Sequence, residues 1–312
     1  MPEKIIAVAG PTASGKTALA IEIAKKYNGE VVSCDSMQIY KHMDIGTAKP
    51  TPEEMEGIAH HMIDVAEPFE NYSVADYVKA ARECIDDIIS RGKLPILAGG
   101  TGLYMDSVIK NIEFSEDCKA EGLREELQKI ADTEGAERLH AMLKERDEEA
   151  AEKIHPNNIR RVIRAIEVCV TTGKTFTEVS RNSRKEPIYD ALIFGLEYER
   201  DVLYARINRR VDLMVEAGLI DEVEKLKDMG LRDEHTAMQA IGYKEFAEYL
   251  NDEASLSDAI EKVKQESRRY AKRQLTWFKR NPSIIWFMLQ EDYSLDKICE
   301  KCFTFIDEFG II

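Results

Sequence analysis

The stretch that decides the fold is Gly10-Pro11-Thr12-Ala13-Ser14-Gly15-Lys16-Thr17, a complete G-x-x-x-x-G-K-[ST] phosphate loop. An apolar run at 5–8 precedes it and a helix-forming stretch at 18–26 follows it. In this context the backbone N–H groups point inward, the helix N-terminus adds a positive potential, and Lys16 adds a full charge. All eight residues are therefore predicted to bind a phosphorylated ligand.

Composition indicates an ordinary cytosolic protein. The chain has 312 residues, 44% hydrophobic and 32% charged, which suits one large α/β domain with a smaller insertion. No apolar run reaches the roughly 18 residues of a membrane span, and the first strand begins too early to leave room for a signal peptide. The net charge of −15 argues against indiscriminate nucleic-acid binding, although Arg268–Arg280 carries six cations and no acid.

Cysteines and histidines give little sign of a metal or redox site. The six cysteines are scattered, which favours free thiols, and Cys299-x-x-Cys302 has no second pair or histidines nearby to complete a zinc site. His60 and His61 are adjacent and cannot share one helical face, so we expect a loop or a strand edge there.

The order of elements predicts a P-loop NTPase-like α/β fold. Strands are expected at 30–34 and 94–98, with a helix between them, so the sheet should be parallel and its ligand site should lie at the carboxyl ends of the strands. Lys16, Asp35 and Thr101 would meet on that edge. The sheet should resume at 191–196 and end at 284–287, and the helices expected in this part span 201–217, 220–229, 243–250 and 256–279, the last ended by Pro282.

Between these parts the sequence is charged and helical without a strand. Helices are expected at 123–130, 137–144 and 159–170. We therefore expect a helical insertion domain at 113–189 and a parallel sheet flanked by helices in a catalytic core built from 1–112 and 190–312.

The carboxylates near the loop favour a transferase over a motor ATPase. An ATPase would end an apolar strand in an acid that holds magnesium and directs a water, whereas the third strand here ends in Gly99-Gly100. Asp35 is the one carboxylate expected nearby. Thr17 is expected to supply a hydroxyl ligand to Mg²⁺.

Several segments in the same order resemble the bacterial type of the tRNA dimethylallyltransferases, also called tRNA isopentenyltransferases or the IPP transferase family. The zinc-finger extension of eukaryotic members is missing from this sequence. The matching segments cover nearly the whole chain; they are Gly10–Thr17, Asp35–Tyr40, Asp44–Pro50, Gly99–Tyr104, His155–Asn158 with Arg160 and Arg161, Gln239–Lys244, and Lys272–Lys279.

The resemblance implies transfer of a dimethylallyl group from dimethylallyl pyrophosphate to N6 of the adenosine at tRNA position 37, without consumption of ATP. The phosphate loop would hold the pyrophosphate leaving group, with Mg²⁺ and Lys16 stabilising its charge. Arg206 and Arg210 match family positions near the pyrophosphate. A solvated helix face is the alternative for both.

Asp35 is the candidate general base. It would accept a proton from the exocyclic amine, a step that typically contributes ~10²- to 10⁴-fold in rate. The alternatives are that Asp35 caps the next helix or holds a magnesium-bound water. Thr101 would hydrogen-bond the amine or the base, or else fix its loop.

The implied partner is the anticodon stem-loop of tRNA, with no membrane contact and the chain acting as a monomer. The target adenosine must leave its stack to be modified, and Gln38 is able to offer a donor and an acceptor to a purine edge. Trp277 and Phe278 are expected either to stack on bases or to pack in the core. The expected tRNA contacts are Asp35, Ser36, Met37, Gln38, Thr101, Arg124, Ile159, Arg160, Arg161, Val162, Ile163, Gln239, Gly242, Tyr243, Lys244, Lys272, Arg273, Gln274, Trp277 and Lys279.

Two other functions fit the phosphate loop. A small-molecule kinase would bind ATP there and turn it over without RNA. A non-catalytic RNA-binding regulator would respond to bound nucleotide and leave the mass of the RNA unchanged.

Overall fold

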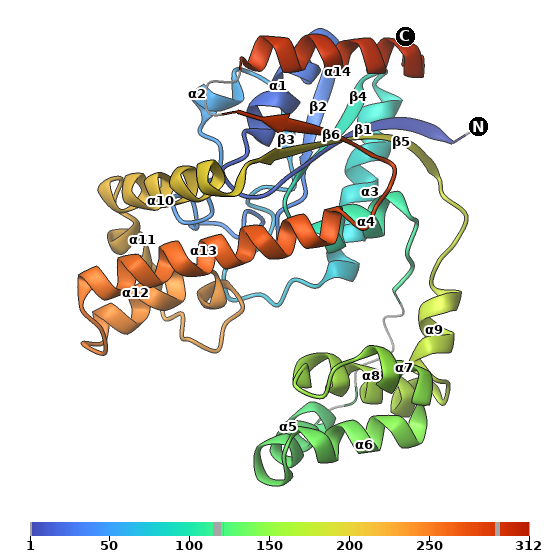
Figure 1. Cartoon of the computed structure of the whole chain (residues 1–312), viewed down its shortest axis with the longest axis vertical. Helices are drawn as coiled ribbons and strands as arrows, with labels where there is room; N and C mark the ends of the chain where they lie inside the picture. Colours follow the sequence, from blue (N-terminus) through green and yellow to red (C-terminus); the bar gives the residue numbers. More distant parts are fainter. Residues whose placement is uncertain (1, 115–119, 121, 291–293, 312) are drawn as a thin grey trace. The chain divides into compact units, whose positions relative to one another are not determined.

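The structure is a computed structural model that describes residues 2–114, 120, 122–290 and 294–311. Its contacts divide the chain into two compact units, the first made of Met1–Ile109 with Ile188–Ile312 and the second of Lys110–Pro187. Both units are drawn in Figure 1.

A parallel six-stranded sheet forms the centre of the first unit, which confirms the expected α/β fold class. The strands lie in the order β3-β2-β4-β1-β5-β6, and every registered pair is parallel. Their bounds are Glu3–Ala9 (β1), Gly29–Ser33 (β2), His60–His61 (β3), Leu94–Gly99 (β4), Tyr189–Tyr198 (β5) and Ile284–Leu289 (β6). The two histidines form the edge strand β3; of the two expectations for them, a loop or a strand edge, the structure has the strand edge.

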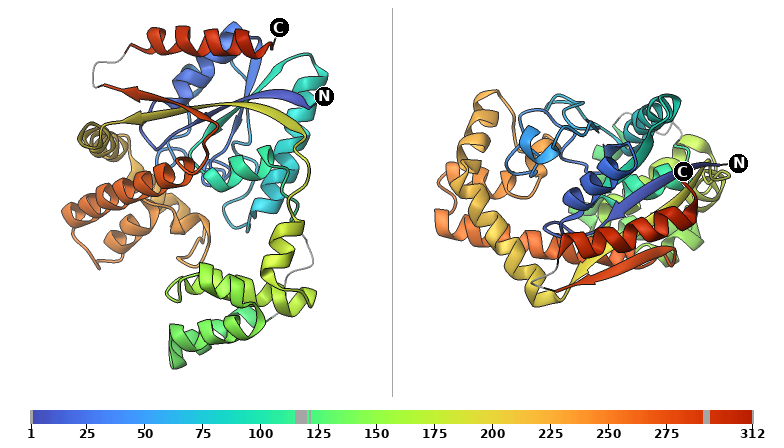
Figure 2. Two further views of the ribbon diagram at one scale, coloured as in Figure 1. Left: turned by 45° about the vertical axis from the view of Figure 1, so that its right-hand side comes forward. Right: turned by 90° about the horizontal axis from the view of Figure 1, so that it is seen from above.

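Helices cover both faces of this sheet (Figure 1; Figure 2). Helices α1 (Lys16–Lys26) and α14 (Leu295–Phe309) contact each other and one face, and α3 (Val74–Ser90) and α4 (Gly102–Ile109) cover the other. The main core joins β1, β2, β4 and β5 to α1 and α14 through side chains such as Ile6, Ile96 and Phe194. This burial holds the carboxyl ends of the strands in a fixed arrangement.

A second core lies under the helices that follow β5. Helices α10 (Arg200–Glu216), α11 (Leu219–Asp228), α12 (Tyr243–Leu250) and α13 (Leu256–Phe278) occur here with the short helices α2 (Pro52–Met55) and η1 (Ala237–Gln239). Tyr40 and Met43, from the segment after β2, pack in this core with Tyr243 and Phe246. The segment that follows Asp35 is therefore anchored on α11–α13.

The second unit is a helical bundle. Its helices are α5 (Leu123–Glu134), α6 (Ala136–Arg146), α7 (Glu148–Lys153), α8 (Ile159–Thr172) and α9 (Phe176–Asn182). Leu139, Leu143 and Val162 are fully buried in its core. Its described residues contain an isolated antiparallel bridge between Ile112 and Arg184.

Some helices differ from the sequence expectations. Helices α4, α7, α9 and α14 were not predicted, although α14 has the helical spacing of apolar residues, including Cys299, Cys302 and Ile306. The long helix α13 ends at Phe278, four residues before Pro282, because the chain turns at 279–281. Pro282 therefore lies beyond the end of this helix, after the turn.

The cysteines within the described residues are free thiols, and Cys118 lies outside them. Cys299 and Cys302 are buried on α14 in the main core. Searching the described parts of the chain for membrane-spanning helices finds none with the required length and apolar character.

Glu30 offers a direct test of the packing at the β3 edge. Its buried carboxylate accepts hydrogen bonds from Arg91 at 2.5 and 2.6 Å, from Lys93 at 2.7 Å and from His61 at 2.7 Å, which joins β2, β3 and the end of α3. Hydrogen bonds from Arg91, with those from Lys93 and His61, hold the pKa of Glu30 well below its ordinary value of 4.5, against the opposing effect of burial.

We expect Glu30→Gln to lower the free energy of unfolding by about 2 kcal/mol at pH 7, measured by urea denaturation. A depressed pKa adds stability above pH 4.5, so the difference from the native chain should shrink as pH falls below that value. Glu56→Gln, which removes an exposed partner of Lys25, is the control and should change stability by less than about 1 kcal/mol. Equal effects of the two substitutions would contradict this assignment.

Candidate active site

The phosphate loop connects β1 to α1 and has the strained backbone that an anion cradle requires. Gly15 has φ 87° and Ala13 has φ 62°, both left-handed. Gly10 is packed so closely that a Cβ there would lie 2.7 Å from Ser14 Oγ. Ser14 is fully buried, and its Oγ has no hydrogen-bond partner among the described residues. An unsatisfied buried hydroxyl inside a cradle of N–H groups suits an oxyanion ligand.

Lys16 is the most perturbed cation in this cradle. Its Nζ lies 3.5 Å from the carbonyl oxygen of Pro11. Burial and then repulsion from Arg210 lower the pKa of Lys16 to about 8, while attraction to Asp35 acts in the opposite direction. Because the charged amine is held in a poorly solvated site, a bound anion would stabilise it strongly.

Arg206 and Arg210 of α10 face the same space. Arg206 donates from Nε to the carbonyl oxygen of Ala13 at 3.0 Å, and its guanidinium lies 4.7 Å from the ring centre of Tyr198. Burial lowers the pKa of Arg210, a shift that the nearby carboxylates of Glu54 and Asp35 partly oppose. Both arginines line the cavity and are partly buried, so the alternative of a solvated helix face does not hold.

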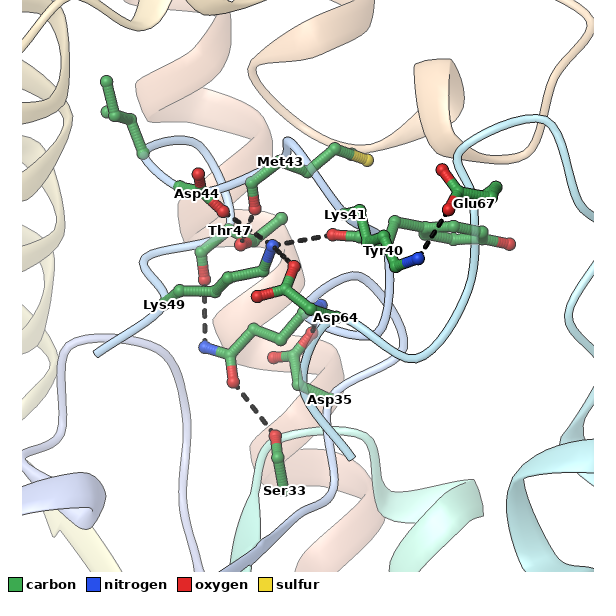
Figure 3. Close-up of polar contacts among 12 residues, drawn as sticks. Ser33, Asp35, Tyr40, Lys41, Met43, Asp44, Thr47, Lys49, Asp64 and Glu67 are labelled. Atoms are coloured by element: carbon green, nitrogen blue, oxygen red, sulfur yellow. Dashed lines mark hydrogen bonds and ion pairs between the residues drawn. The ribbon is translucent and has the colours of Figure 1, made fainter. Parts of the chain in front are cut away.

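Asp35 follows β2 and faces the phosphate loop. Its Oδ1 accepts from the backbone N–H groups of Met37 at 2.9 Å and Gln38 at 3.4 Å, and Figure 3 shows this carboxylate beside the loop that follows it. These bonds fix the turn that follows Asp35; because residues 36–39 form a turn and not a helix, Asp35 does not cap a helix there. The same carboxylate lines the cavity, so the turn holds in place a group that remains available for chemistry.

Thr101 joins the ends of β4 and β2. Its Oγ1 accepts from the N–H of Ser36 at 3.1 Å, and its own N–H donates to the carbonyl oxygen of Cys34 at 3.0 Å. A Cβ at Gly99 would lie 2.2 Å from that same Cys34 oxygen, so only glycine allows this approach. Thr101 therefore fixes its loop, and it does so next to the candidate base.

Gln274 was predicted to contact RNA, but it is 5% exposed and lies inside the protein. Its Oε1 accepts from the N–H of Thr12 at 3.0 Å, and its Nε2 donates to the carbonyl oxygen of Gly100 at 3.0 Å. Tyr270, one turn earlier on α13, lines the same cavity as Gln274. Gln274 thus links the phosphate loop to the turn after β4.

These groups surround one cavity of about 960 Å³. The structure brings Lys16, Asp35, Arg206 and Arg210 together in its lining, whereas Thr101 is not a lining residue and lies beside Ser36, which is. The lining also includes Thr12, Ala13, Gly15, Thr17, Ser36, Met37, Gln38, Gln239, Gly242, Tyr270, Arg273 and Gln274.

The other predicted RNA contacts in this unit divide by exposure. Lys244, Lys272 and Arg273 are exposed. Trp277 is 37% exposed, whereas Phe278 is 3% exposed and packs inside, as the core alternative had it. Tyr243 is buried and donates its hydroxyl to Glu222.

Further side chains among these candidates already have partners. Lys279 pairs with Glu197 at 2.6 Å. Gln239 donates to the carbonyl oxygen of Asp233. The amide of Gln38 bonds within the protein, accepting from Ser33 at 2.9 Å and donating to the carbonyl oxygens of Thr47 and Ala48.

In the second unit, α8 presents the predicted basic segment. Arg160 and Arg161 are exposed and Ile159 is partly exposed, whereas Val162 and Ile163 pack into the core and are not accessible to RNA phosphates. Arg124 donates from Nε and Nη2 to the buried carboxylate of Glu167, at 2.8 Å each. Arg124 therefore has a structural partner that sequence reasoning missed.

Sequence reasoning also missed Tyr270, Glu54 and Gly46, which line the cavity. A signal for Tyr270 existed, because it lies one helical turn before Gln274 in the basic stretch. Gly46 comes from the loop after Asp35, and Glu54 comes from the short helix α2. The spacing of residues in these segments does not indicate that they line the cavity.

The site suits a hard cation with oxygen ligands. No group of three or more His, Cys, Asp and Glu side chains that would hold a metal occurs in the part of the chain that the structure describes. Magnesium usually keeps several waters and binds through one or two protein oxygens plus ligand phosphates. Thr17 lines the cavity together with Asp35, and its hydroxyl is an oxygen ligand of the kind that this pattern uses.

Comparison with known proteins assigns the family. The model of the IPP transferase family matches residues 38–281. The chain is 51% identical to the tRNA dimethylallyltransferase of Caldanaerobacter subterraneus subsp. tengcongensis over 98% of both chains. It is 49% identical to that of Bacillus subtilis, over 97% of this chain and 96% of the relative.

Solved structures agree. The tRNA isopentenylpyrophosphate transferase of Bacillus halodurans is 48% identical, with a TM-score of 0.75 over 98% of this chain and 96% of that one. A eukaryotic dimethylallyltransferase acting on tRNA is 31% identical, with a TM-score of 0.83 over 98% of this chain and 80% of that one. From the fold, the phosphate-loop cavity and these matches along nearly its whole length, this chain belongs to the IPP transferase family of tRNA dimethylallyltransferases.

Proposed function

We propose that the protein transfers a dimethylallyl group from dimethylallyl pyrophosphate to N6 of the adenosine at position 37 of tRNA. The observation that carries the proposal is the single cavity in which the cations Lys16, Arg206 and Arg210 face the carboxylate of Asp35. One side of the cavity suits a diphosphate, and the other suits an amine that must lose a proton.

The reaction divides between these two sides. As the bond between the allylic carbon and the diphosphate oxygen breaks, its electron pair leaves with the diphosphate. Lys16, Arg206 and the N–H groups of the phosphate loop stabilise the added charge. The lone pair on N6 forms the new C–N bond, and Asp35 accepts the N6 proton. The turn bonds from Met37 and Gln38 hold that carboxylate in position throughout.

Magnesium is part of this proposal. Thr17 and the diphosphate oxygens would hold Mg²⁺, which would neutralise charge on the leaving group. We also propose that the protein acts as a monomer. Since the proposed substrate is tRNA, we place the activity in the cytoplasm.

The relatives named above support tRNA as the substrate, and the distribution of exposed cations supports a route for binding it. Lys272 and Arg273 lie on α13 next to the cavity, and Arg273 also lines it. On a chain with a net charge of −15 such a local basic surface is needed to attract phosphates.

The experiment that tests the proposal is mass spectrometry of nucleosides from unmodified tRNA after incubation with the protein, Mg²⁺ and dimethylallyl pyrophosphate. We expect a five-carbon adduct on adenosine. Asp35→Asn retains an oxygen for the turn bonds but accepts no proton, so turnover should fall by about 10²-fold or more with an unchanged melting temperature. Asp201→Asn, an exposed carboxylate in the first turn of α10, is the control. Near-native turnover by Asp35→Asn would remove the base assignment.

The low pKa of Lys16 predicts a pH limit on diphosphate binding. Lys16 is charged below about pH 8 in the free protein and loses that charge above it. The affinity for dimethylallyl pyrophosphate without tRNA should thus be level from pH 7 to about 8 and fall at higher pH, by up to about tenfold per pH unit. Ionisation of the ligand does not contribute to this decline in affinity, because its terminal phosphate ionises at about pH 6. Calorimetric titration measures this effect.

Lys16→Arg provides the control for that titration, since a guanidinium stays charged over this range. Its affinity should lack the decline above pH 8. A parallel decline in Lys16→Arg, or no decline in the native protein, would be incompatible with a titrating Lys16.

Binding of tRNA should weaken steeply with salt, because contacts with phosphates release counterions. The double variant Lys272→Ala/Arg273→Ala should reduce the slope of log affinity against log salt by about 2, as measured by filter binding. A control pair, Lys297→Ala/Lys301→Ala, removes exposed cations from α14 and should leave the slope unchanged. Equal slopes for both pairs would place the RNA surface elsewhere.

A further inference from the structure

We propose that Glu222 of α11 is a positioning residue that clamps the loop 36–50 and through it holds the candidate base Asp35. This inference rests on the proposed function, because it assigns Glu222 a role in that reaction. Glu222 lies outside every motif segment that resembles the family, and it does not line the cavity.

The carboxylate of Glu222 is enclosed by four donors. Its Oε2 accepts from the N–H groups of Asp44 and Ile45, at 2.8 Å each, and its Oε1 accepts from the N–H of Gly46 at 3.1 Å and the hydroxyl of Tyr243 at 2.6 Å. Three successive backbone N–H groups that converge in this way form an anion-binding concavity. Here the anion is a side chain from another element, so the contact fixes the loop onto α11.

Close packing leaves this clamp little freedom. A Cβ at Gly46 would lie 2.5 Å from the ring of Tyr243, so the loop backbone rests directly on that ring. Burial, with the charge of Glu222, raises the pKa of Tyr243 well above its usual range. The hydroxyl therefore remains protonated and keeps donating to the carboxylate.

The buried side chain of Lys49 holds the loop 36–50 through several contacts (Figure 3). Its side chain is 6% exposed, and Nζ donates to the carbonyl oxygen of Tyr40 at 2.7 Å while pairing with Asp44 at 2.7 Å and Asp64 at 2.6 Å. The part of the loop that Glu222 holds is thereby tied to the segment directly after Asp35.

Gln38 connects the part of the loop that Glu222 holds to Asp35. Its Nε2 donates to the carbonyl oxygens of Thr47 and Ala48, at 3.2 and 3.1 Å, and its backbone N–H donates to Asp35 Oδ1 at 3.4 Å. Displacement of residues 44–48 would therefore disturb the turn that orients the base. The phosphate loop is held separately, by Gln274 and Arg206. Loss of the clamp should impair proton transfer and leave the diphosphate cradle intact.

Glu222→Gln tests the clamp, because an amide has one acceptor oxygen and turns an NH₂ group toward the loop N–H groups. We expect amide hydrogen exchange at residues 44–46 to accelerate by about tenfold or more. The kcat for prenyl transfer should fall by about tenfold or more, since small misplacements of a catalytic group are costly. Affinity for inorganic pyrophosphate without tRNA should stay within about twofold. A purely structural role would reduce both binding and turnover.

Two further variants sharpen the result. Glu224→Gln changes an exposed carboxylate on the same helix and should leave exchange, kcat and pyrophosphate affinity unchanged. Tyr243→Phe removes one of the four donors while retaining the ring against Gly46, so its effects should have the same pattern and a smaller size. Tyr243→Phe also serves as the test variant if Glu222→Gln does not fold.

The proposal is overturned if kcat in Glu222→Gln remains within about twofold of the native value, if pyrophosphate affinity falls in step with kcat, or if exchange at 44–46 is unaffected. Absence of transfer by the native protein would contradict the proposed function instead. In that case the exchange measurement still decides whether Glu222 clamps the loop.

Discussion

Close backbone contact between the carboxyl ends of β2 and β4 is the constraint on which the site depends. Gly99 sits against the carbonyl group of Cys34, where a Cβ would come within 2.2 Å of the oxygen. The N–H of Thr101 then bonds that same oxygen, and the Thr101 hydroxyl reaches the N–H of Ser36. This approach brings the turn after Asp35 beside the phosphate loop. Gln274 holds the phosphate loop against the turn after β4, because it bonds both Thr12 and Gly100.

The charges of the cavity favour the proposed binding of a diphosphate. Burial lowers the pKa values of both Lys16 and Arg210; repulsion from Arg210 lowers that of Lys16 further, and repulsion from Arg206 lowers that of Arg210. Asp35 offsets part of this repulsion. A ligand with several negative charges relieves it further, and binding is tightest when charge accumulates on the leaving group. The same cavity therefore favours departure of the diphosphate.

Much of this arrangement could be predicted from the sequence. The phosphate loop, Asp35 and the parallel strands follow from local patterns, and parallel strands with connecting helices bring their carboxyl ends to one edge. Contacts over long sequence separations could not be predicted. Gln274 resembles an RNA contact in a basic helix but is buried against the phosphate loop, and Arg124 is bound to Glu167 in the helical unit. The clamp by Glu222 depends on three backbone N–H groups, which carry no side-chain signal. Helix α14 was missed even though its apolar spacing was present.

We propose that the cradle holds a diphosphate that leaves, and that no nucleotide is cleaved there. Phosphorus NMR of a reaction that contains the protein, Mg²⁺, unmodified tRNA, dimethylallyl pyrophosphate and ATP tests it directly. We expect the signals of dimethylallyl pyrophosphate to decline as those of inorganic pyrophosphate grow, with the ATP signals unchanged. Growth of ADP signals while dimethylallyl pyrophosphate persists would contradict it.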